Sequence, residues 1–331
     1  MLRYRLSRRR ARAEREQAIR EVERIAANGR PIVVGPWTGD AGMELLYWIP
    51  FLRWLVTVGG VRPRQVLAIS CGGADPWYAD VSGGYVDLYD GHAISVVRRW
   101  SRERRDEGDL VGSRRHPLDE DVLRRARTLV GNREVDWLHP SLLTRLFAPR
   151  WEFGEAATVV AANSVQRPLP PDLDTHALTL PPDYAAVRVV FGPAFPDTPE
   201  NRTTMEWAIR ALAEQTPVVL LRAQEEPLGH QPYVPPPGLP VLDIVEHLTP
   251  RHALAIQSRV VRGAGAFLST YCGLAFVGPY VGTPTVAVYS RAAFNVAHLD
   301  AIDRVGRRFQ EGVQLFRARH AGSLRKLDSG A

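Results

Sequence analysis

Cysteine and metal-binding patterns are both scarce in this sequence. Cys71 and Cys272 are the only cysteines among 331 residues, and two cysteines cannot make a disulfide framework. The nine histidines contain no HxxxH or HExxH pattern, the spacing that places zinc ligands on one face of a helix. The sequence therefore predicts a chain without a disulfide scaffold, a bound metal or another cofactor.

Charged residues are absent from a long run, residues 263–290, which reads GAGAFLSTYCGLAFVGPYVGTPTVAVYS. About 20 apolar residues can span a bilayer as a helix, but five glycines and two prolines divide this run into shorter pieces. The pieces predict a strand, a turn, a short helix and a second strand, because buried parallel strands are apolar on both faces. The turn holds Thr270, Tyr271, Cys272 and Gly273. Unpaired amides at the start of a helix bind phosphate, so this unit is either a phosphate site or a core unit without a ligand.

Excess positive charge is confined to the N-terminus. The net charge is +6 and the pI about 9.6. The first fifteen residues contain seven arginines and one glutamate, a net +6, so the rest of the chain sums to zero. No basic patch interleaved with aromatic residues follows, and no nucleic-acid partner is expected. Residues 1–30 predict a basic helix that ends at Gly29.

The basic helix leaves two interpretations open. It is either a solvated extension or a segment that contacts an anionic membrane through residues 1–29. The N-terminus has charge but no apolar segment of the kind found in signal peptides. A cytoplasmic protein is therefore expected, peripheral at the inner membrane face if the second interpretation holds.

The first strand of the body, Pro31 to Gly35, leads into a loop and then an apolar helix that begins at Met43 or Glu44, with Pro50 expected to kink it. The loop brings Asp40 and Glu44 to the carboxyl end of that strand, where open α/β sheets bind ligands. Either side chain is catalytic, or Asp40 caps the helix and Glu44 complements its dipole. The loop glycines do not match GxGxxG, so no nicotinamide site is predicted.

The chain predicts two α/β halves joined by a proline-rich linker, residues 166–183. The linker also contains Asp172-Leu173-Asp174, whose place there argues against a metal site. The charged residues 98–136 predict solvated helices and loops, to which no chemistry is assigned. Two Rossmann-like halves predict a ligand cleft between them. The predicted parts are a basic helix (1–30), an N-terminal domain (31–165), the linker, a C-terminal domain (184–310), and a C-terminal tail or helix (311–331).

Four segments resemble glycosyltransferases from bacterial polysaccharide gene clusters and, more distantly, the heptosyltransferases. They are GPWTGDAGMELLYWIPFLRWL, SCGGADPWYADVSGGYVDLYD, FPDTPENR and STYCGLAFVGPYVGTPTVAVYS. The resemblance covers residues 31–305 and implies the GT-B fold, in which two Rossmann-like domains face each other across a cleft. It implies that the N-terminal domain binds the acceptor and the C-terminal domain a nucleotide sugar.

The resemblance also implies roles for particular residues. Heptosyltransferases hold the nucleotide diphosphate at a small-residue turn, which Thr270 and Gly273 match. Their catalytic aspartate follows a glycine and precedes a proline; Gly39-Asp40 matches the dipeptide and Glu44 the distance to the proline, so either carboxylate could be the base. The implied acceptor-side loops contain Gly39, Gly42, Gly72 and Gly73. The candidate donor-binding residues are Arg202, Arg222, Thr270, Tyr271, Cys272, Gly273, Phe294 and Asn295.

Sugar transfer needs a base for the acceptor hydroxyl and a group that stabilises the departing diphosphate. The sequence offers both, which predicts transfer from a nucleoside-diphosphate sugar to a glycan or lipid-linked acceptor. The acid-free run 263–290 favours an inverting, metal-independent reaction, since retaining GT-B enzymes often carry two glutamates in this domain. Three alternatives stay open: a polysaccharide pyruvyltransferase, a nucleotide-sugar epimerase, and a non-catalytic nucleotide-sugar-binding protein.

Overall fold

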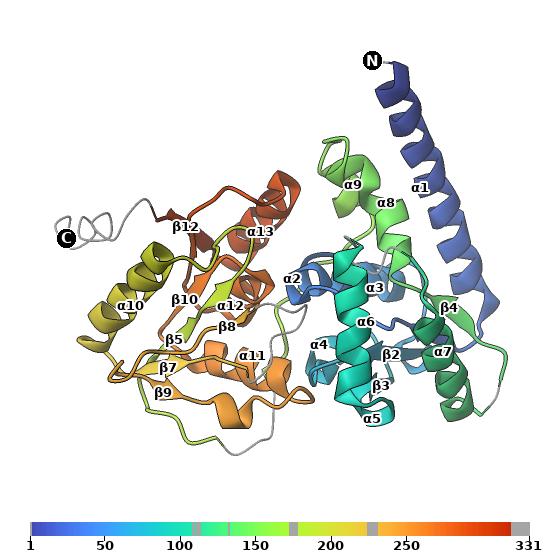
Figure 1. Ribbon diagram of the computed structural model, residues 1–331. Helices are drawn as coiled ribbons and strands as arrows, with labels where there is room; N and C mark the ends of the chain where they lie inside the picture. Colours follow the sequence, from blue (N-terminus) through green and yellow to red (C-terminus); the bar gives the residue numbers. More distant parts are fainter. Residues whose placement is uncertain are drawn as a thin grey trace. The chain divides into compact units, whose positions relative to one another are not determined.

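The chain forms two compact units, Met1–Arg167 and Pro168–Ala331 (Figure 1). The computed structural model describes residues 2–107, 109, 114–131, 133–171, 178–223 and 231–318. The division lies within the predicted linker 166–183. Residues 172–177 of that linker, with Asp172 and Asp174, lie outside the described residues.

Unit 1 is built on a four-stranded parallel sheet in the order β3-β2-β1-β4. Val33 and Ile69 lie on the face that α5, α6 and α7 cover, where Trp100 joins the same apolar core. The strands are β1 (Ile32–Val34), β2 (Val66–Ser70), β3 (Gly84–Asp87) and β4 (Asp136–Leu138). The helices and helical turns are α1 (Leu2–Asn28), α2 (Ala41–Met43), η1 (Glu44–Trp48), α3 (Ile49–Thr57), η2 (Pro63–Gln65), α4 (Asp75–Tyr78), α5 (Leu88–Gly91), α6 (Ile94–Asp106), α7 (Pro117–Leu129), α8 (Ser141–Trp151) and α9 (Thr158–Ala161).

The apolar helix expected from Met43 onward is interrupted. It consists of α2, the π-helical turn η1 and α3, in which Pro50 is the second residue. The amide of Ile49 donates to the carbonyl of Glu44, five residues back. Pro50 has no amide hydrogen, and the side-chain amide of Gln166 donates to the Leu46 carbonyl at 3.0 Å. The proline therefore comes with a π turn, a feature that is frequent at functional sites.

The end of unit 1 is tied to the same helix. The Val165 amide donates to the Pro50 carbonyl at 2.8 Å, and the buried Arg53 donates to the Arg167 carbonyl at 2.9 Å. Together with Gln166, these bonds fix the last three residues of the unit against η1 and α3.

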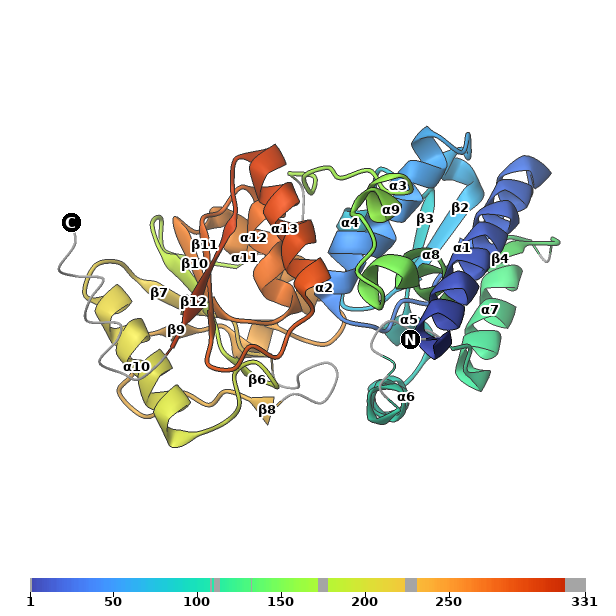
Figure 2. The ribbon, with the colours of Figure 1, turned by 90° about the horizontal axis from the view of Figure 1, so that it is seen from above.

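Unit 2 contains a six-stranded sheet in the order β12-β11-β10-β5-β7-β9, with every pair parallel. Figure 2 shows α10 on one face of this sheet and α11, α12 and α13 on the other. Met205 and Ile209 of α10 pack on Val187, Val218 and Leu220. The strands are β5 (Ala185–Arg188), β6 (Val190–Phe191), β7 (Val218–Leu220), β8 (Gln231–Pro232), β9 (Leu242–Asp243), β10 (Ala266–Thr270), β11 (Thr285–Tyr289) and β12 (Val313–Arg317). The helices and helical turns are α10 (Pro199–Ala213), η4 (Val245–His247), α11 (Ala253–Gly263), η5 (Gly273–Phe276), α12 (Val277–Val281) and α13 (Val296–Phe309).

Two sequence expectations for unit 2 differ from the structure. The tail or helix expected from residue 311 begins with a strand, since β12 pairs with β11 along its whole length; residues 319–331 lie outside the described residues. The short helix after Cys272 is a 3₁₀ turn, η5, followed by the five-residue α12. A side chain at Gly278 would place its Cβ 1.8 Å from the Thr285 hydroxyl, so glycine lets α12 pack directly on β11. Among the described residues, none of the helices has the length and apolar character of a membrane span.

Candidate active site

The carboxyl ends of β1, β2 and β3 carry a cluster of acidic and hydroxyl side chains. Glu44, in the π turn that follows β1, is 1% exposed. Ser70 at the end of β2 donates its hydroxyl to Glu44 Oε1 at 2.7 Å, and Tyr78 of α4 donates to the same oxygen at 2.5 Å. The parallel register of the strands thus brings together residues that are 26 and 34 positions apart in the sequence.

Burial raises the pKa of Glu44 from 4.5 to about 8. The hydrogen bonds from Ser70 and Tyr78 lower this pKa, and the charges of Asp40 and Asp87 raise it. Removal of a carboxylate from water is the dominant effect, as expected for a group with so little exposure. Glu44 is therefore mostly protonated and uncharged at neutral pH.

Asp40 has a different environment. It is half-buried and precedes α2, and its Oδ1 accepts hydrogen bonds from the amides of Gly42 at 2.8 Å and Met43 at 3.2 Å. It is the N-cap of this short helix, as one of the two interpretations expected. The capping bonds also fix the carboxylate in one orientation. Of the two predicted candidates, Asp40 is the one that is partly exposed to solvent.

A second buried carboxylate, Asp87, lies at the end of β3 and is 4% exposed. It accepts hydrogen bonds from the Gly73 amide at 2.9 Å, the Tyr89 amide at 2.9 Å and the Tyr85 hydroxyl at 3.2 Å. Burial raises the pKa of Asp87 to about 6. Gly72 and Gly73 have φ angles of 83° and 73°, in the left-handed region that glycine adopts without strain. Their turn directs the Gly73 amide at the Asp87 carboxylate.

Ser70, Tyr78 and Asp87 were not predicted as site residues from the sequence. The signal available for Ser70 and Asp87 was their position, since each is the last residue of a strand that ends at the ligand-binding edge. Tyr78 belongs to the short helix after β2 and had no comparable signal.

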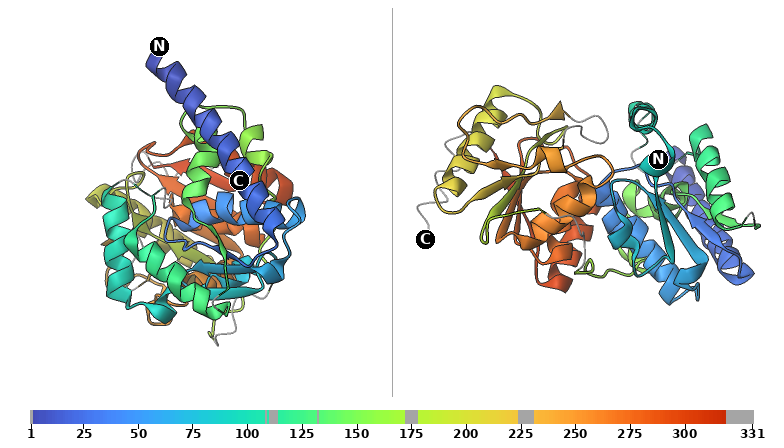
Figure 3. Two further views of the ribbon diagram at one scale, coloured as in Figure 1. Left: turned by 90° about the vertical axis from the view of Figure 1, so that its right-hand side faces the viewer. Right: turned by 90° about the horizontal axis from the view of Figure 1, so that it is seen from below.

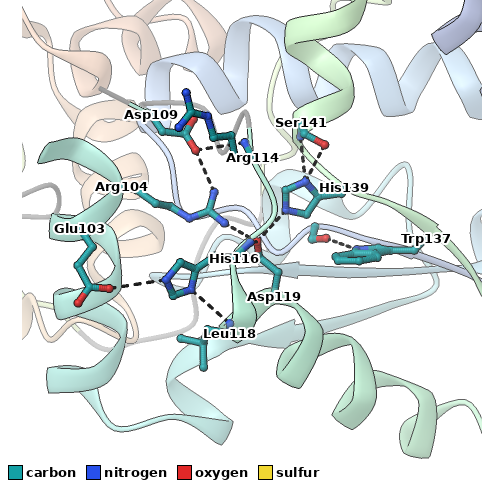
Figure 4. Close-up of polar contacts among 11 residues, drawn as sticks. Glu103, Arg104, Asp109, Arg114, His116, Leu118, Asp119, Trp137, His139 and Ser141 are labelled. Carbon is teal, nitrogen blue, oxygen red and sulfur yellow. Dashed lines mark hydrogen bonds and ion pairs between the residues drawn. The ribbon is translucent and has the colours of Figure 1, made fainter. Parts of the chain in front are cut away.

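A separate polar network lies behind the end of β4 (Figure 4). Asp119 is fully buried, and its Oδ2 accepts hydrogen bonds from the Arg104 guanidinium and from the His116 amide at 2.6 Å, and lies 3.0 Å from His139 Nε2. His139 Nδ1 accepts the Ser141 amide at 3.1 Å and lies 2.9 Å from the Ser141 hydroxyl. A backbone amide always donates, so Nδ1 is unprotonated here and Nε2 carries the hydrogen.

This network has the composition of a serine-hydrolase triad, but its geometry is that of a cap. The Ser141 amide, which begins α8, is bonded to the imidazole, and the next amide, of Leu142, donates to the His139 carbonyl at 3.0 Å. The first amides of α8 are therefore occupied and offer no oxyanion site. The network joins α6, α7 and α8. Its members Arg104, His116 and Asp119 lie in the charged stretch 98–136, to which the sequence assigned no chemistry.

In unit 2, the predicted phosphate turn is occupied by internal hydrogen bonds. Thr270 is fully buried; its hydroxyl accepts from the Val190 amide at 2.8 Å and donates to the Val190 carbonyl at 2.9 Å. The Thr270 hydroxyl thus joins β10 to β6 and has no proton left for a phosphate. Cys272 and Gly273 lead into η5, a four-residue turn that is too short to carry a substantial helix dipole.

The two predicted donor-binding arginines each have a carboxylate partner. Arg202 forms two hydrogen bonds to Asp197, at 2.5 and 2.7 Å, and its guanidinium lies over the Phe191 ring at 4.7 Å. Arg222 binds Asp243 at 2.7 and 2.9 Å. A diphosphate would have to exchange with these carboxylates to bind either arginine.

Three aromatic side chains gather at the carboxyl ends of β10 and β11. The ring of Phe294 lies 5.0 Å from Tyr271 and 5.2 Å from Tyr289. All three are partly exposed. The next residue, Asn295, caps α13 by accepting the Ala297 amide at 2.8 Å. The structure thus brings Tyr271, Phe294 and Asn295 together, whereas Arg202 and Arg222 are held in their own ion pairs.

No group of three histidine, cysteine, aspartate or glutamate side chains that could hold a metal ion occurs in the described part of the chain.

No family model and no curated protein sequence matches the chain. Solved structures with a similar fold include E. coli heptosyltransferase WaaC with ADP-2-deoxy-2-fluoro heptose, with a TM-score of 0.44, 13% identity and coverage of 91% of this chain and 100% of that one. E. coli ADP-heptose LPS heptosyltransferase II has a TM-score of 0.43 and 11% identity, with coverage of 80% of this chain and 86% of that one. A family 9 glycosyl transferase from Veillonella parvula has a TM-score of 0.43 and 13% identity, with coverage of 91% of this chain and 89% of that one. The α/β class with two Rossmann-like units is confirmed, and likenesses of this size assign no residue a role.

Proposed function

We propose that the protein is a glycosyltransferase that moves a sugar from a nucleoside-diphosphate donor to a glycan or lipid-linked acceptor. The observation that supports it best is the acid cluster at the carboxyl edge of the unit 1 sheet. It combines an accessible, oriented carboxylate with two buried acids whose pKa values are raised, and such perturbed groups concentrate at functional sites.

In this proposal Asp40 is the general base. It is the accessible carboxylate, whereas Glu44 is protonated and buried and cannot take up another proton. Glu44 instead positions the loop through Ser70 and Tyr78 and, because it is uncharged, places no second negative charge beside Asp40. A base in this position takes the acceptor hydroxyl proton as the bond to the sugar forms, a contribution of about 100- to 10,000-fold in rate.

The proposed reaction inverts the configuration at the anomeric carbon, C1, of the donor sugar and uses no metal ion. The acceptor oxygen attacks C1 of the donor sugar and its proton goes to Asp40. The bond from C1 to the diphosphate oxygen breaks, and the diphosphate leaves with the electron pair. Unit 2 would hold the donor, with its nucleobase against Tyr271 and Phe294 and its diphosphate near the backbone of Cys272 and Gly273 and the cap at Asn295. Arg202 and Arg222 would reach the diphosphate after exchange of their carboxylates.

The proposal also includes the location of the reaction. A lipid-linked acceptor lies at a membrane surface, and residues 1–29 would bring the enzyme to the anionic inner face of that membrane from the cytoplasm.

Two variants of matched size test the function. Asp40→Asn should bind the donor with unchanged affinity and lose turnover, while Glu44→Gln should keep most of its turnover because glutamine resembles the protonated acid. Donor binding is measured by thermal shift against UDP-, GDP-, dTDP-, ADP- and CMP-sugars; a ligand at a hundredfold excess over Kd stabilises by about 2.7 kcal/mol. Turnover is then measured with the stabilising donor by release of its nucleotide, a nucleoside diphosphate for every donor except the CMP-sugars.

Full turnover in Asp40→Asn would remove Asp40 as the base. Stabilisation by a nucleotide sugar without any turnover across acceptors would favour a binding protein. The absence of stabilisation by every donor would overturn the transferase proposal.

A further inference from the structure

The helix α1 is anchored to unit 1 along one face. Ala11, Ala18, Val22 and Ile25 are buried where α1 packs against α8. These residues recur at the spacing of an amphipathic helix. The helix is therefore a fixed part of the unit, and its other face has a defined orientation.

The arginines on the anchored side are engaged by unit 1. Arg8 Nε and Arg12 Nε both donate to Glu155 Oε1, at 2.9 and 2.6 Å, and these partners lower the pKa of Glu155. Arg15 donates to the Asn163 side chain at 2.8 Å. These contacts hold the N-terminal half of α1 against the segment that follows α8.

The charge of α1 is divided sharply along its length. Residues 2–13 contain six arginines and no acid, whereas residues 14–28 contain three arginines and four glutamates. Figure 3 shows the N-terminal turns of α1 extending beyond α8 and α9. The excess charge of the helix therefore lies in its N-terminal half, where Arg8 and Arg12 are paired with Glu155 and Arg10 with Glu14.

The projecting end also exposes apolar surface. Tyr4 and Leu6 are 54% and 55% exposed, and the Tyr4 ring lies 5.6 Å from that of Phe153. Arg5 and Arg9 are exposed as well and lie four residues apart, on one face with Leu6. Tyr4 lies on the anchored side, whereas Leu6 and the two arginines face away from unit 1. An exposed leucine flanked by arginines is typical of a helix that lies in the interface of an anionic bilayer.

We infer that the outward face formed by Arg5, Leu6 and Arg9, opposite the anchored side of α1, is a membrane-docking surface whose partner is an anionic lipid bilayer. The commitment to lipid comes from the exposed Leu6 between the two arginines, which a nucleic-acid phosphate backbone would leave in water. The surface deepens the proposed location of the enzyme, but it needs no sugar transfer to operate. Its test is a binding measurement, so its failure and that of the transferase proposal are distinguishable.

The experiment measures partitioning of the full chain onto phosphatidylcholine vesicles with and without phosphatidylglycerol. Wild type should bind only the anionic vesicles and should be released by salt. Each basic residue near such a surface contributes a factor of about five, so Arg5→Glu/Arg9→Glu should lower the partition coefficient at least about 25-fold. Leu6→Ser should weaken binding while leaving the salt dependence of the remainder unchanged.

The matched control is Arg20→Glu/Arg127→Glu, which makes the same change in net charge at two exposed arginines away from the projecting end. It should retain at least most of the wild-type binding, and circular dichroism should show all variants folded. The inference is overturned if both double variants lose binding equally, if pure phosphatidylcholine binds as well, or if wild type prefers duplex DNA or RNA to anionic vesicles.

Discussion

The buried carboxyl of Glu44 makes a quantitative prediction about stability and pH. Its pKa is about 8 in the folded protein, against 4.5 for a glutamate exposed to water, as in the unfolded chain. The folded state therefore holds this proton more tightly than the unfolded state does. The stability that the proton contributes is complete below pH 4.5 and is lost as the pH rises through 8. A difference of this size corresponds to roughly 5 kcal/mol, which is large beside the total of about 5–15 kcal/mol that holds a typical protein folded.

Glu44→Gln isolates this contribution. Glutamine keeps an oxygen to accept from Ser70 and Tyr78 and cannot ionise. We expect the unfolding free energy of wild type, relative to Glu44→Gln, to fall by roughly 5 kcal/mol as the pH rises across this window. Asp87 titrates in both proteins, so its effect cancels in the difference. The exposed Glu120→Gln is the control and should follow wild type at every pH.

Urea unfolding monitored by tryptophan fluorescence suits this measurement, because seven of the eight tryptophans lie in unit 1 and only Trp207 lies in unit 2. Parallel curves for wild type and Glu44→Gln from pH 4.5 to 8 would show that Glu44 is not a buried neutral acid. The assignment of Asp40 as the accessible base would then lose its main support.

Three other substitutions have defined outcomes. Thr270→Val leaves the Val190 amide and carbonyl without a partner and should destabilise unit 2 by about 1–3 kcal/mol in urea unfolding; an unchanged midpoint would contradict a structural role. Asp119→Asn removes the nearer of the two carboxylates paired with the buried Arg104; because Asp109 remains 3.4 Å away, a loss of about 1–3 kcal/mol is expected for unit 1; fluorescence unfolding at the wild-type urea concentration would show that the network does not contribute to stability. Gly278→Ala forces a methyl group onto a β11 hydroxyl and should lower stability by at least about 1–3 kcal/mol, measured by thermal unfolding, whereas a neutral effect would show that α12 can shift.

The strands β1, β10 and β11 were accessible from the sequence because they are short apolar runs bounded by small residues. The same logic placed Asp40 and Glu44 at a strand end. It could not place Ser70, Tyr78 and Asp87 beside Glu44, since that contact depends on which strands become neighbours. The strand β4 was not accessible, because it begins at the end of the charged stretch 98–136, where only solvated helices and loops were expected.

The prediction for Thr270 relied on residue type and missed the environment. A threonine after a strand suits a phosphate site, but here β6 runs close enough to take both hydrogen-bonding capacities of the hydroxyl. The strand β12 was missed for a related reason: five residues with mixed polarity form an edge strand only because β11 offers them a pairing partner.

The way the chain leaves unit 1 has a mechanical consequence. Gln166 and Arg167 are bonded to Leu46 and Arg53, on the helical segment that begins with Glu44. A force applied to the polypeptide beyond Arg167 is therefore transmitted through these bonds to η1 and α3. Glu44 thus lies on the helical segment to which the end of unit 1 is directly bonded.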